Sequence, residues 1–158
     1  MSITQPGPSR ELLHSTTYLL KRLGFAVKER AYEAFDAIGA GPQQHAVLSL
    51  LEEGARETQG TIADALGYDR SQLVGLLDEL EERGFVERRR DPDDRRRHLV
   101  SLTPEGRRVS TRLRAIVKRV DDDFFAPLDA EQRETLKSLL QELASHHDVR
   151  FKKPTAKN

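Results

Sequence analysis

The chain has 158 residues, of which 37% are hydrophobic and 33% charged, so it can bury one core of ordinary domain size while exposing much polar helix surface. It contains no cysteine, which excludes disulfides, thiol catalysis, thiol redox sensing and cysteine-bound zinc. No run approaches 18 apolar residues and the N-terminus lacks an apolar secretion signal, so we expect a cytoplasmic protein without a membrane partner.

The charges balance to zero over the whole chain but are distributed unevenly. Between Arg83 and Arg119 there are 13 lysines and arginines against five acidic residues, a local excess of eight positive charges. The remainder of the chain carries the opposite excess. A nucleic-acid phosphate would meet the basic segment and not the chain average, so zero net charge does not exclude a DNA partner.

The N-terminal part of the chain predicts an arm and a long helix. Residues 1–9 are rich in proline and glycine and are expected to form a flexible arm. Apolar residues then recur at helical spacing from Arg10 to about Ile38, which predicts one helix with a bend near Gly24. The glycines and proline of residues 39–42 should end this helix.

Three shorter helices are expected next. The first covers about 43–54, ends at Gly54 and should bury Ala46, Val47, Leu50 and Leu51. Thr58 can cap the second helix, and a turn at 67–69 follows, in which Asp69 can cap the third helix over 70–83. The third helix should bury Leu73, Val74, Leu76, Leu77 and Leu80, with Gly84 at its end.

The residue pattern then changes to that of a β-hairpin. Residues 85–88 and 98–102 suit short strands, and Asp91–Asp94 is a turn-forming cluster between them. The tip and flanks carry six arginines, at positions 88, 89, 90, 95, 96 and 97.

Two long helices are expected after the hairpin. Thr103, followed by proline and glutamate, is a helix start, and the helix should run to about Phe125. Asp129 can cap a last helix over about 130–149, whose inward-facing residues should be Leu136, Leu139, Leu140 and Leu143. Residues 151–158 are expected to form a flexible tail.

A helix, a turn, a second helix and a basic hairpin form the order of a winged helix-turn-helix. The second helix can enter the DNA major groove, where its first turn would present Arg70, Ser71 and Gln72 to base edges. Gly75 lies one turn later, and close approach of the helix to DNA would explain a glycine that costs about 1 kcal/mol relative to alanine. The alternative is that these are ordinary solvated residues and that the glycine is merely tolerated.

The hairpin would supply the wing. An arginine at its tip can enter the minor groove, and Arg96 is the best candidate because Asp94, two residues earlier, can hold its guanidinium. Arg95 and Arg97 should point to the opposite side, and a solvated charged face is the alternative for all of them. The predicted DNA contacts are Thr58, Arg70, Ser71, Gln72, Gly75, Arg89, Arg90, Asp94, Arg95 and Arg96.

Four stretches resemble the MarR family (multiple antibiotic resistance regulators) of winged helix-turn-helix transcriptional regulators. They are Ile-Ala-Asp-Ala-Leu at 62–66, Leu-Asp-Glu-Leu-Glu-Glu-Arg-Gly-Phe-Val at 77–86, Asp-Pro-Asp-Asp-Arg-Arg at 91–96 and Leu-Thr-Pro-Glu-Gly at 102–106. The wing motif, Asp94 and Arg96 followed by Leu-Thr-x-x-Gly, is highly specific to that family. The long flanking helices also match in order and length, so the resemblance covers nearly the whole chain.

The resemblance implies a mostly α fold with a small β-hairpin wing, in which long dimerisation helices flank the winged helix-turn-helix. It assigns 10–42 and 104–150 to dimerisation and 43–103 to DNA binding. It implies a homodimer on a palindromic operator with half-sites about one turn (roughly 10 bp) apart. Repression is the commoner mode in the family, and the location would be the cytoplasm, in association with the nucleoid.

The resemblance also implies release or modulation by a small molecule, often an anionic aromatic, bound between the dimerisation helices and the winged helix. Such a ligand needs a cation or histidine and an aromatic wall, and the candidates are Tyr18, Arg22 and His45. A core or interface role is the alternative for Tyr18 and His45. No cofactor or metal is expected, because the adjacent histidines at 146 and 147 diverge on a helix and the aspartates at 121–123 lack the spacing of a calcium loop.

Two other classes of protein, an enzyme and a winged helix that binds only proteins, fit the sequence less well. An enzyme that uses a winged helix for dimerisation would need a catalytic part, and the chain has no glycine-rich phosphate loop, nucleophile elbow or metal-ligand spacing. We therefore expect that it is not an enzyme. A winged helix that only binds proteins would not need the basic wing or the polar first turn at Arg70–Gln72.

Overall fold

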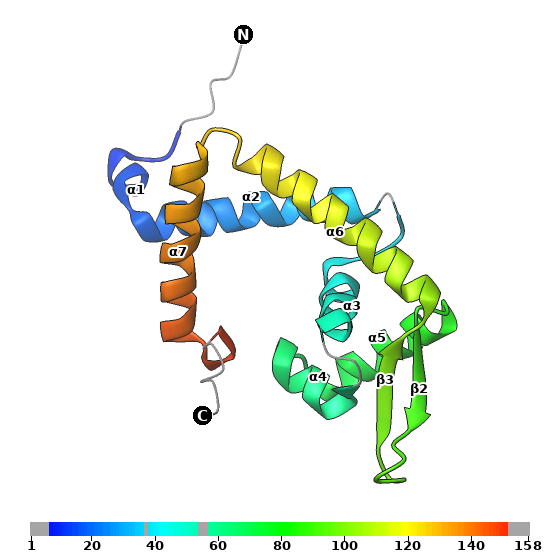
Figure 1. Cartoon of the computed structure of the whole chain (residues 1–158). Coiled ribbons are helices and arrows are strands. Elements are labelled where there is room, and N and C mark those ends of the chain that lie inside the picture. Colours follow the sequence, from blue (N-terminus) through cyan, green and yellow to red (C-terminus); the bar gives the residue numbers. More distant parts are fainter. Residues whose placement is uncertain (1–6, 37, 54–56, 152–158) are drawn as a thin grey trace.

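The computed structural model describes residues 7–36, 38–53 and 57–151. The mostly helical fold with a small wing is confirmed (Figure 1). Most of the predicted arm, Gly54 and the tail beyond Phe151 lie outside the described residues. The elements are α1 (Arg10–His14), α2 (Thr16–Asp36), α3 (Pro42–Glu53), β1 (Glu57–Thr58), α4 (Gln59–Leu66), α5 (Arg70–Glu82), β2 (Val86–Arg90), β3 (His98–Leu102), α6 (Pro104–Phe124), α7 (Ala130–His147) and the short 3-10 helix η1 (Val149–Phe151).

The predicted N-terminal helix is interrupted at Ser15, and Gly24 lies inside the continuous helix α2. Ser15 has an extended backbone, with φ −85° and ψ 111°. Its Oγ accepts a hydrogen bond from the N–H of Tyr18 at 3.3 Å, so the serine side chain starts a new helix. Ser9 caps α1 in the same way, with its Oγ 3.4 Å from the N–H of Leu12.

The turn between α2 and α3 forms where the glycines and proline predicted it. Gly39 has a φ of +61°, and Pro42 is the first residue of α3, where its missing N–H costs no helical hydrogen bond. The buried residues of α3 are Gln44, Val47, Leu48 and Leu51. Of the predicted stripe, Val47 and Leu51 are buried, whereas Ala46 and Leu50 are half-buried, and Leu50 packs against the core.

The two helices of the predicted helix-turn-helix are both present, with their caps. The Oγ1 of Thr58 accepts the N–H of Thr61 at 3.1 Å, and the Oγ1 of Thr61 accepts the N–H of Thr58 at 2.9 Å. Gly67 ends α4 with a φ of +66°, in the left-handed region that favours glycine. Asp69 then caps α5 by accepting the N–H of Ser71 at 2.8 Å.

The hairpin is part of an antiparallel three-stranded sheet with strand order β1-β3-β2. In β2 and β3, Arg88 pairs with Val100 and Arg90 with His98. The short strand β1 pairs with β3 at Val100 and Leu99. The tip of the hairpin projects away from α2 and α6 (Figure 1), as a wing does.

The core joins the helix-turn-helix to the two long helices. Its fully buried side chains include Leu48, Ile62, Leu73, Leu77 and Leu113, and α6 packs against both α2 and α3. Thr103 caps α6 and Asp129 caps α7, as the sequence predicts. None of the helices in these described ranges is both long and apolar enough to cross a membrane.

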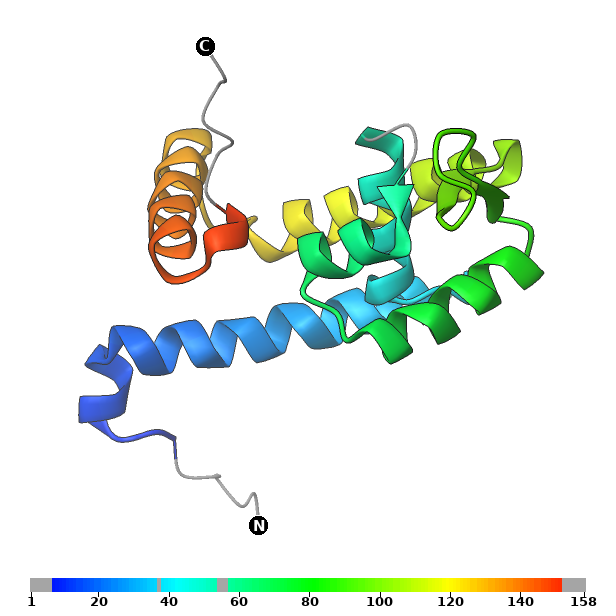
Figure 2. The same cartoon turned by 90° about the horizontal axis from the view of Figure 1, so that it is seen from below.

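Helix α7 lies away from this core (Figures 1 and 2). The prediction that its leucines face inward is wrong for a single chain, because Leu139, Leu140 and Leu143 are 38–54% exposed. The apolar stripe has the helical spacing that predicted burial, but no part of the core within residues 7–36, 38–53 and 57–151 of the same chain covers it.

Candidate nucleic-acid interface

The first turn of α5 carries the three residues predicted to read DNA bases, and all three are exposed. Asp69 accepts the N–H groups of Ser71 and Gln72, and these hydrogen bonds, with one from the Ser71 hydroxyl, hold the pKa of its carboxyl below the usual value. The Ser71 hydroxyl is thus already engaged. Within the described part of the chain, the side chains of Arg70 and Gln72 make no hydrogen bond, so both remain available to a ligand.

The outer face of α5 also contains a residue that sequence reasoning misplaced. Val74 was expected in the core but is 40% exposed, because Leu73, Leu77 and Leu80 occupy the buried stripe and Val74 lies about 100° from Leu73 around the helix. Gly75 is exposed too, and a methyl group there would meet nothing within 4 Å. Packing inside the chain therefore gives no reason for this glycine.

At the tip of the hairpin, Asp94 holds Arg96 as predicted. Its Oδ1 accepts the backbone N–H of Arg96 at 3.0 Å and the Nε–H of the same residue at 3.3 Å. The N–H of Arg97 also donates to the carbonyl of Asp94 at 2.8 Å, which closes the turn. The Arg96 side chain is still 92% exposed, so the base of its guanidinium is held while the terminal nitrogens face solvent.

The six hairpin arginines differ in what they contact. Arg88 turns inward and forms ion pairs with Asp78 and Glu81 of α5. Arg89 pairs with Glu87 on its own strand at 2.9 Å. Among the described residues, the remaining arginines at positions 90, 95 and 97 form no ion pair and are exposed. The sequence alone did not distinguish these groups, because the partners of Arg88 lie on another element.

Thr58, the other predicted contact, lies where β1 meets α4. It is half-buried, and its hydroxyl already takes part in the capping box with Thr61, whose Oγ1 also donates to Glu57 at 2.6 Å. The first role of Thr58 is therefore to start α4. Contact with a DNA phosphate stays a prediction for this residue.

The C-terminal end of α5 is fastened to the scaffold by a polar network that the sequence did not reveal. Buried Gln44 of α3 donates through Nε2 to Glu79 at 2.5 Å. Arg83 donates to the carbonyl of Gly39 at 2.7 Å, and its guanidinium lies 4.6 Å from the ring centre of Phe85. These contacts connect the orientation of α5 to the turn between α2 and α3.

The three predicted ligand contacts do not come together within one chain. The ring of His45 lies 5.7 Å from that of Phe35, near the end of α2. Tyr18 lies 17 residues before Phe35 in the same helix, and a rise of 1.5 Å per residue separates them by about 25 Å. Arg22 lies one turn beyond Tyr18 and is exposed. His45 is thus on a different part of the scaffold from the other two.

The surroundings of His45 are enclosed and partly aromatic. Its Nδ1 is buried without a hydrogen-bond partner among the described residues, and burial, followed by the charge of Arg114, lowers the pKa of the ring. Tyr68 lies in the turn before α5. Burial, followed by the proximity of Tyr32 of α2, raises the pKa of its phenol. The Nζ of Lys28 lies 5.6 Å from the centre of the Tyr32 ring. Sequence reasoning did not select Tyr68, because a turn residue gives no periodic pattern.

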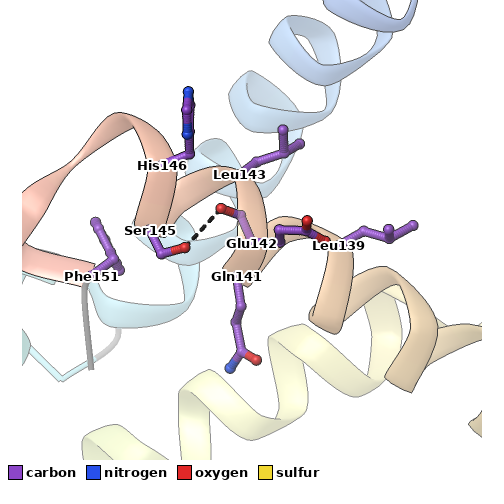
Figure 3. A pocket seen from close by; sticks show the side chains of 7 residues that line it. All are labelled: Leu139, Gln141, Glu142, Leu143, Ser145, His146 and Phe151. Atoms are coloured by element: carbon purple, nitrogen blue, oxygen red, sulfur yellow. Dashed lines mark hydrogen bonds between the residues drawn. The ribbon is translucent and has the colours of Figure 1, made fainter. Parts of the chain in front are cut away.

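A hollow with a volume of about 1370 Å³ lies along α7 (Figure 3). It is open to solvent, and its lining comes from α7 and η1: Leu139, Gln141, Glu142, Leu143, Ser145, His146 and Phe151. The Ser145 hydroxyl donates to the backbone carbonyl of Glu142 at 2.8 Å. The hollow therefore presents two exposed leucines of α7 and Phe151 beside four polar side chains.

Comparison with known proteins gives consistent matches. A model of the MarR family matches residues 38–97. The putative transcriptional regulatory protein for the hcr operon of Thauera aromatica is 32% identical over 141 residues, which cover 84% of each chain.

Solved structures of one regulator match over most of the chain. The transcriptional repressor CouR bound to a 23-mer DNA duplex has a TM-score of 0.80 and 34% identity, with coverage of 89% of this chain and 99% of CouR. CouR from Rhodococcus jostii RHA1 bound to p-coumaroyl-CoA has a TM-score of 0.74 and 36% identity, with coverage of 86% and 96%.

Proposed function

Because the chain belongs to the MarR family of DNA-binding transcriptional regulators, we propose that it is a homodimeric repressor that binds a palindromic operator and is released by a small aromatic effector. One observation carries the DNA-binding proposal. Arg96 is held at its base by Asp94 yet is almost fully exposed, on the wing that follows a helix whose first turn leaves Arg70 and Gln72 available.

Each part of this surface has a role that its chemistry suits. Arg70 can bond a guanine and Gln72 an adenine in the major groove, while the N-terminus of α5 favours a phosphate. Arg96 would enter the minor groove, and the exposed arginines at positions 89, 90 and 95 would contact phosphates. Val74 adds an apolar side chain on the same outer part of α5 that suits a thymine methyl group.

The dimer proposal rests on the apolar surface that one chain leaves uncovered. Leu139 and Leu143 of α7, and Leu19, Leu20 and Leu23 of α2, are all between 42% and 54% exposed. A second copy that covers these helices would remove this surface from water. Such a two-fold dimer would present two α5 helices to the DNA, which favours a palindromic site with half-sites about one turn apart.

The effector proposal draws on CouR, which has been solved with p-coumaroyl-CoA bound. In this chain, His45, Tyr32 and Tyr68 offer a histidine and aromatic rings where the scaffold meets the helix-turn-helix. Tyr18 and Arg22 would join this site only if the partner subunit supplies them. A ligand that alters the distance between α2 and the turn at Tyr68 would change the orientation of α5 and weaken DNA binding.

The test is a titration of DNA from the region upstream of the protein's own gene, followed by fluorescence anisotropy. We expect binding in the nanomolar range, with one dimer per palindrome and a steep dependence on salt. A shuffled duplex of the same length and composition is the control for specificity. Gln72→Ala is expected to change the preference among single-base variants of the site. Equal affinity for the upstream and shuffled duplexes would contradict the proposal.

A further inference from the structure

We propose that Arg88 is a positioning residue for DNA binding, which fastens the wing to α5 by pairing with two carboxylates of that helix. The inference rests on the proposed function, because it concerns the same interface. The sequence places Arg88 among the wing arginines, but the structure gives it a different set of contacts from Arg90 or Arg96.

The contacts of Arg88 form a fork between β2 and α5. Its Nε and Nη2 donate to Oε2 of Glu81 at 2.9 and 2.6 Å, and Nη2 also donates to Asp78. Its backbone N–H donates to the other oxygen of Glu81, Oε1, at 3.1 Å. Only 21% of the Arg88 side chain is exposed, so this fork is shielded more than an ordinary surface ion pair.

This fork determines the direction in which the wing leaves the protein. Side chains alternate along a strand, so Arg88 and Arg90 lie on the same face of β2, and Arg90 comes two residues closer to the tip. With both the main chain and the side chain of Arg88 tied to Glu81, β2 has a fixed position against α5. The separation between Arg96 and the first turn of α5 follows from that position.

The same fork alters the charge that DNA would meet. The second half of α5 carries four acidic residues, at positions 78, 79, 81 and 82. Asp78 lies seven residues after Ser71 and therefore on the same face of α5 as that residue of its first turn. A carboxylate there repels phosphates, and the positive charge of Arg88 offsets one of the two negative charges of Asp78 and Glu81. Arg83 does the same for Glu79, at 3.6 Å.

The competing role for Arg88 is direct contact with a phosphate, and the two roles predict different effects. A phosphate contact contributes about 0.9 to the slope of log affinity against log salt, whereas a positioning residue contributes nothing to it. Removal of the charge of Glu81 should by itself strengthen the attraction to DNA. If Arg88 acts through Glu81, the same change should weaken binding instead.

The experiment compares Arg88→Gln, Glu81→Gln and the double variant, with Arg90→Gln as the matched phosphate-contact control. Operator affinity is measured by anisotropy over a series of salt concentrations. We expect Arg88→Gln and Glu81→Gln each to weaken binding about tenfold without a change in salt slope, and the double variant to be no weaker than Arg88→Gln. Arg90→Gln should lower the slope by about one. Arg88→Lys keeps the charge without the fork and should lie between wild type and Arg88→Gln.

Hydrogen exchange without DNA separates this inference from the proposed function. The N–H of Asp91, which donates across the wing to the carbonyl of Arg97, and the N–H of Arg97, which donates to Asp94 in the tip turn, should exchange faster in Arg88→Gln than in wild type. The N–H groups of the α5 core residues should exchange at the wild-type rate. If the wild-type protein does not bind the operator, the proposed function is wrong. The exchange rates still test whether Arg88 holds the wing against α5. A lower salt slope in Arg88→Gln with unchanged affinity in Glu81→Gln would overturn the inference, as would unchanged exchange in the wing.

Discussion

Gly106 of α6 lies directly against the carbonyl group of Phe85, where the chain leaves α5 and enters the wing. A methyl group at position 106 would overlap the Phe85 carbonyl oxygen and lie only 2.8 Å from the carbonyl carbon. Thr103 strengthens the same contact, because its N–H donates to the carbonyl of Phe85 at 3.1 Å and its hydroxyl to that of Gly84 at 2.6 Å. The start of α6 and the base of the wing therefore form one unit, which accounts physically for the Leu-Thr-x-x-Gly motif.

The first prediction is that Gly106→Ala destabilises the protein although alanine favours helices. The methyl group meets backbone, which cannot rotate away as a side chain can, so β2 or α6 must shift. We expect a loss of about 1–3 kcal/mol in the free energy of unfolding, measured by urea denaturation. Gly24→Ala is the matched control, because that position is also helical and nothing lies within 4 Å of the added methyl. Equal stability changes in the two variants would contradict the close contact.

The second prediction concerns Gly75, where stability and DNA binding should change in opposite directions. The position is helical and open, so Gly75→Ala should stabilise the free protein by up to about 1 kcal/mol. If α5 approaches DNA closely at this point, the same methyl group should weaken operator binding. Thermal unfolding and anisotropy measure the two effects. Undiminished affinity in the stabilised variant would show that the glycine is not needed for close approach.

Features set by neighbouring residues could be predicted from the sequence. The helix caps at Thr58, Asp69, Thr103 and Asp129 are all present, since each depends on a side chain that reaches an N–H two or three residues later. The pair Asp94 and Arg96 is of the same kind. These short-range contacts define the ends of the helices and the shape of the wing tip.

Features that depend on distant residues could not be predicted. Strand β1 has two residues and gives no alternating pattern. The inward orientation of Arg88 depends on Glu81 and Asp78, which lie on another element. Nothing in the sequence therefore distinguishes Arg88 from Arg90. The leucines of α7 have the spacing of buried residues, but the spacing does not say whether the covering surface comes from the same chain.

The third prediction separates the two members of the wing-tip pair. Arg96→Ala should weaken operator binding about tenfold and lower the salt slope, because a cation is lost from the groove. Asp94→Asn should weaken binding less and leave the slope unchanged, because Arg96 keeps its charge and loses only its orientation. Light scattering should find the same mass for both variants as for wild type, since the wing lies away from α7. Unchanged affinity in Arg96→Ala would show that the wing assignment is wrong.

The fourth prediction is a loss of stability below neutral pH that originates at His45. Burial, followed by the charge of Arg114, lowers the pKa of this ring in the folded chain relative to 6.5, so the fold favours the neutral form. The contribution to stability is therefore complete above pH 6.5 and is lost as the pH falls through the lower folded pKa. Urea denaturation from pH 8 to 5 should reveal this loss in wild type, and His45→Gln should reduce it. His98→Gln is the control, because His98 is exposed at the base of the wing loop. If the two variants follow the same pH profile as wild type, the buried ring does not carry the effect.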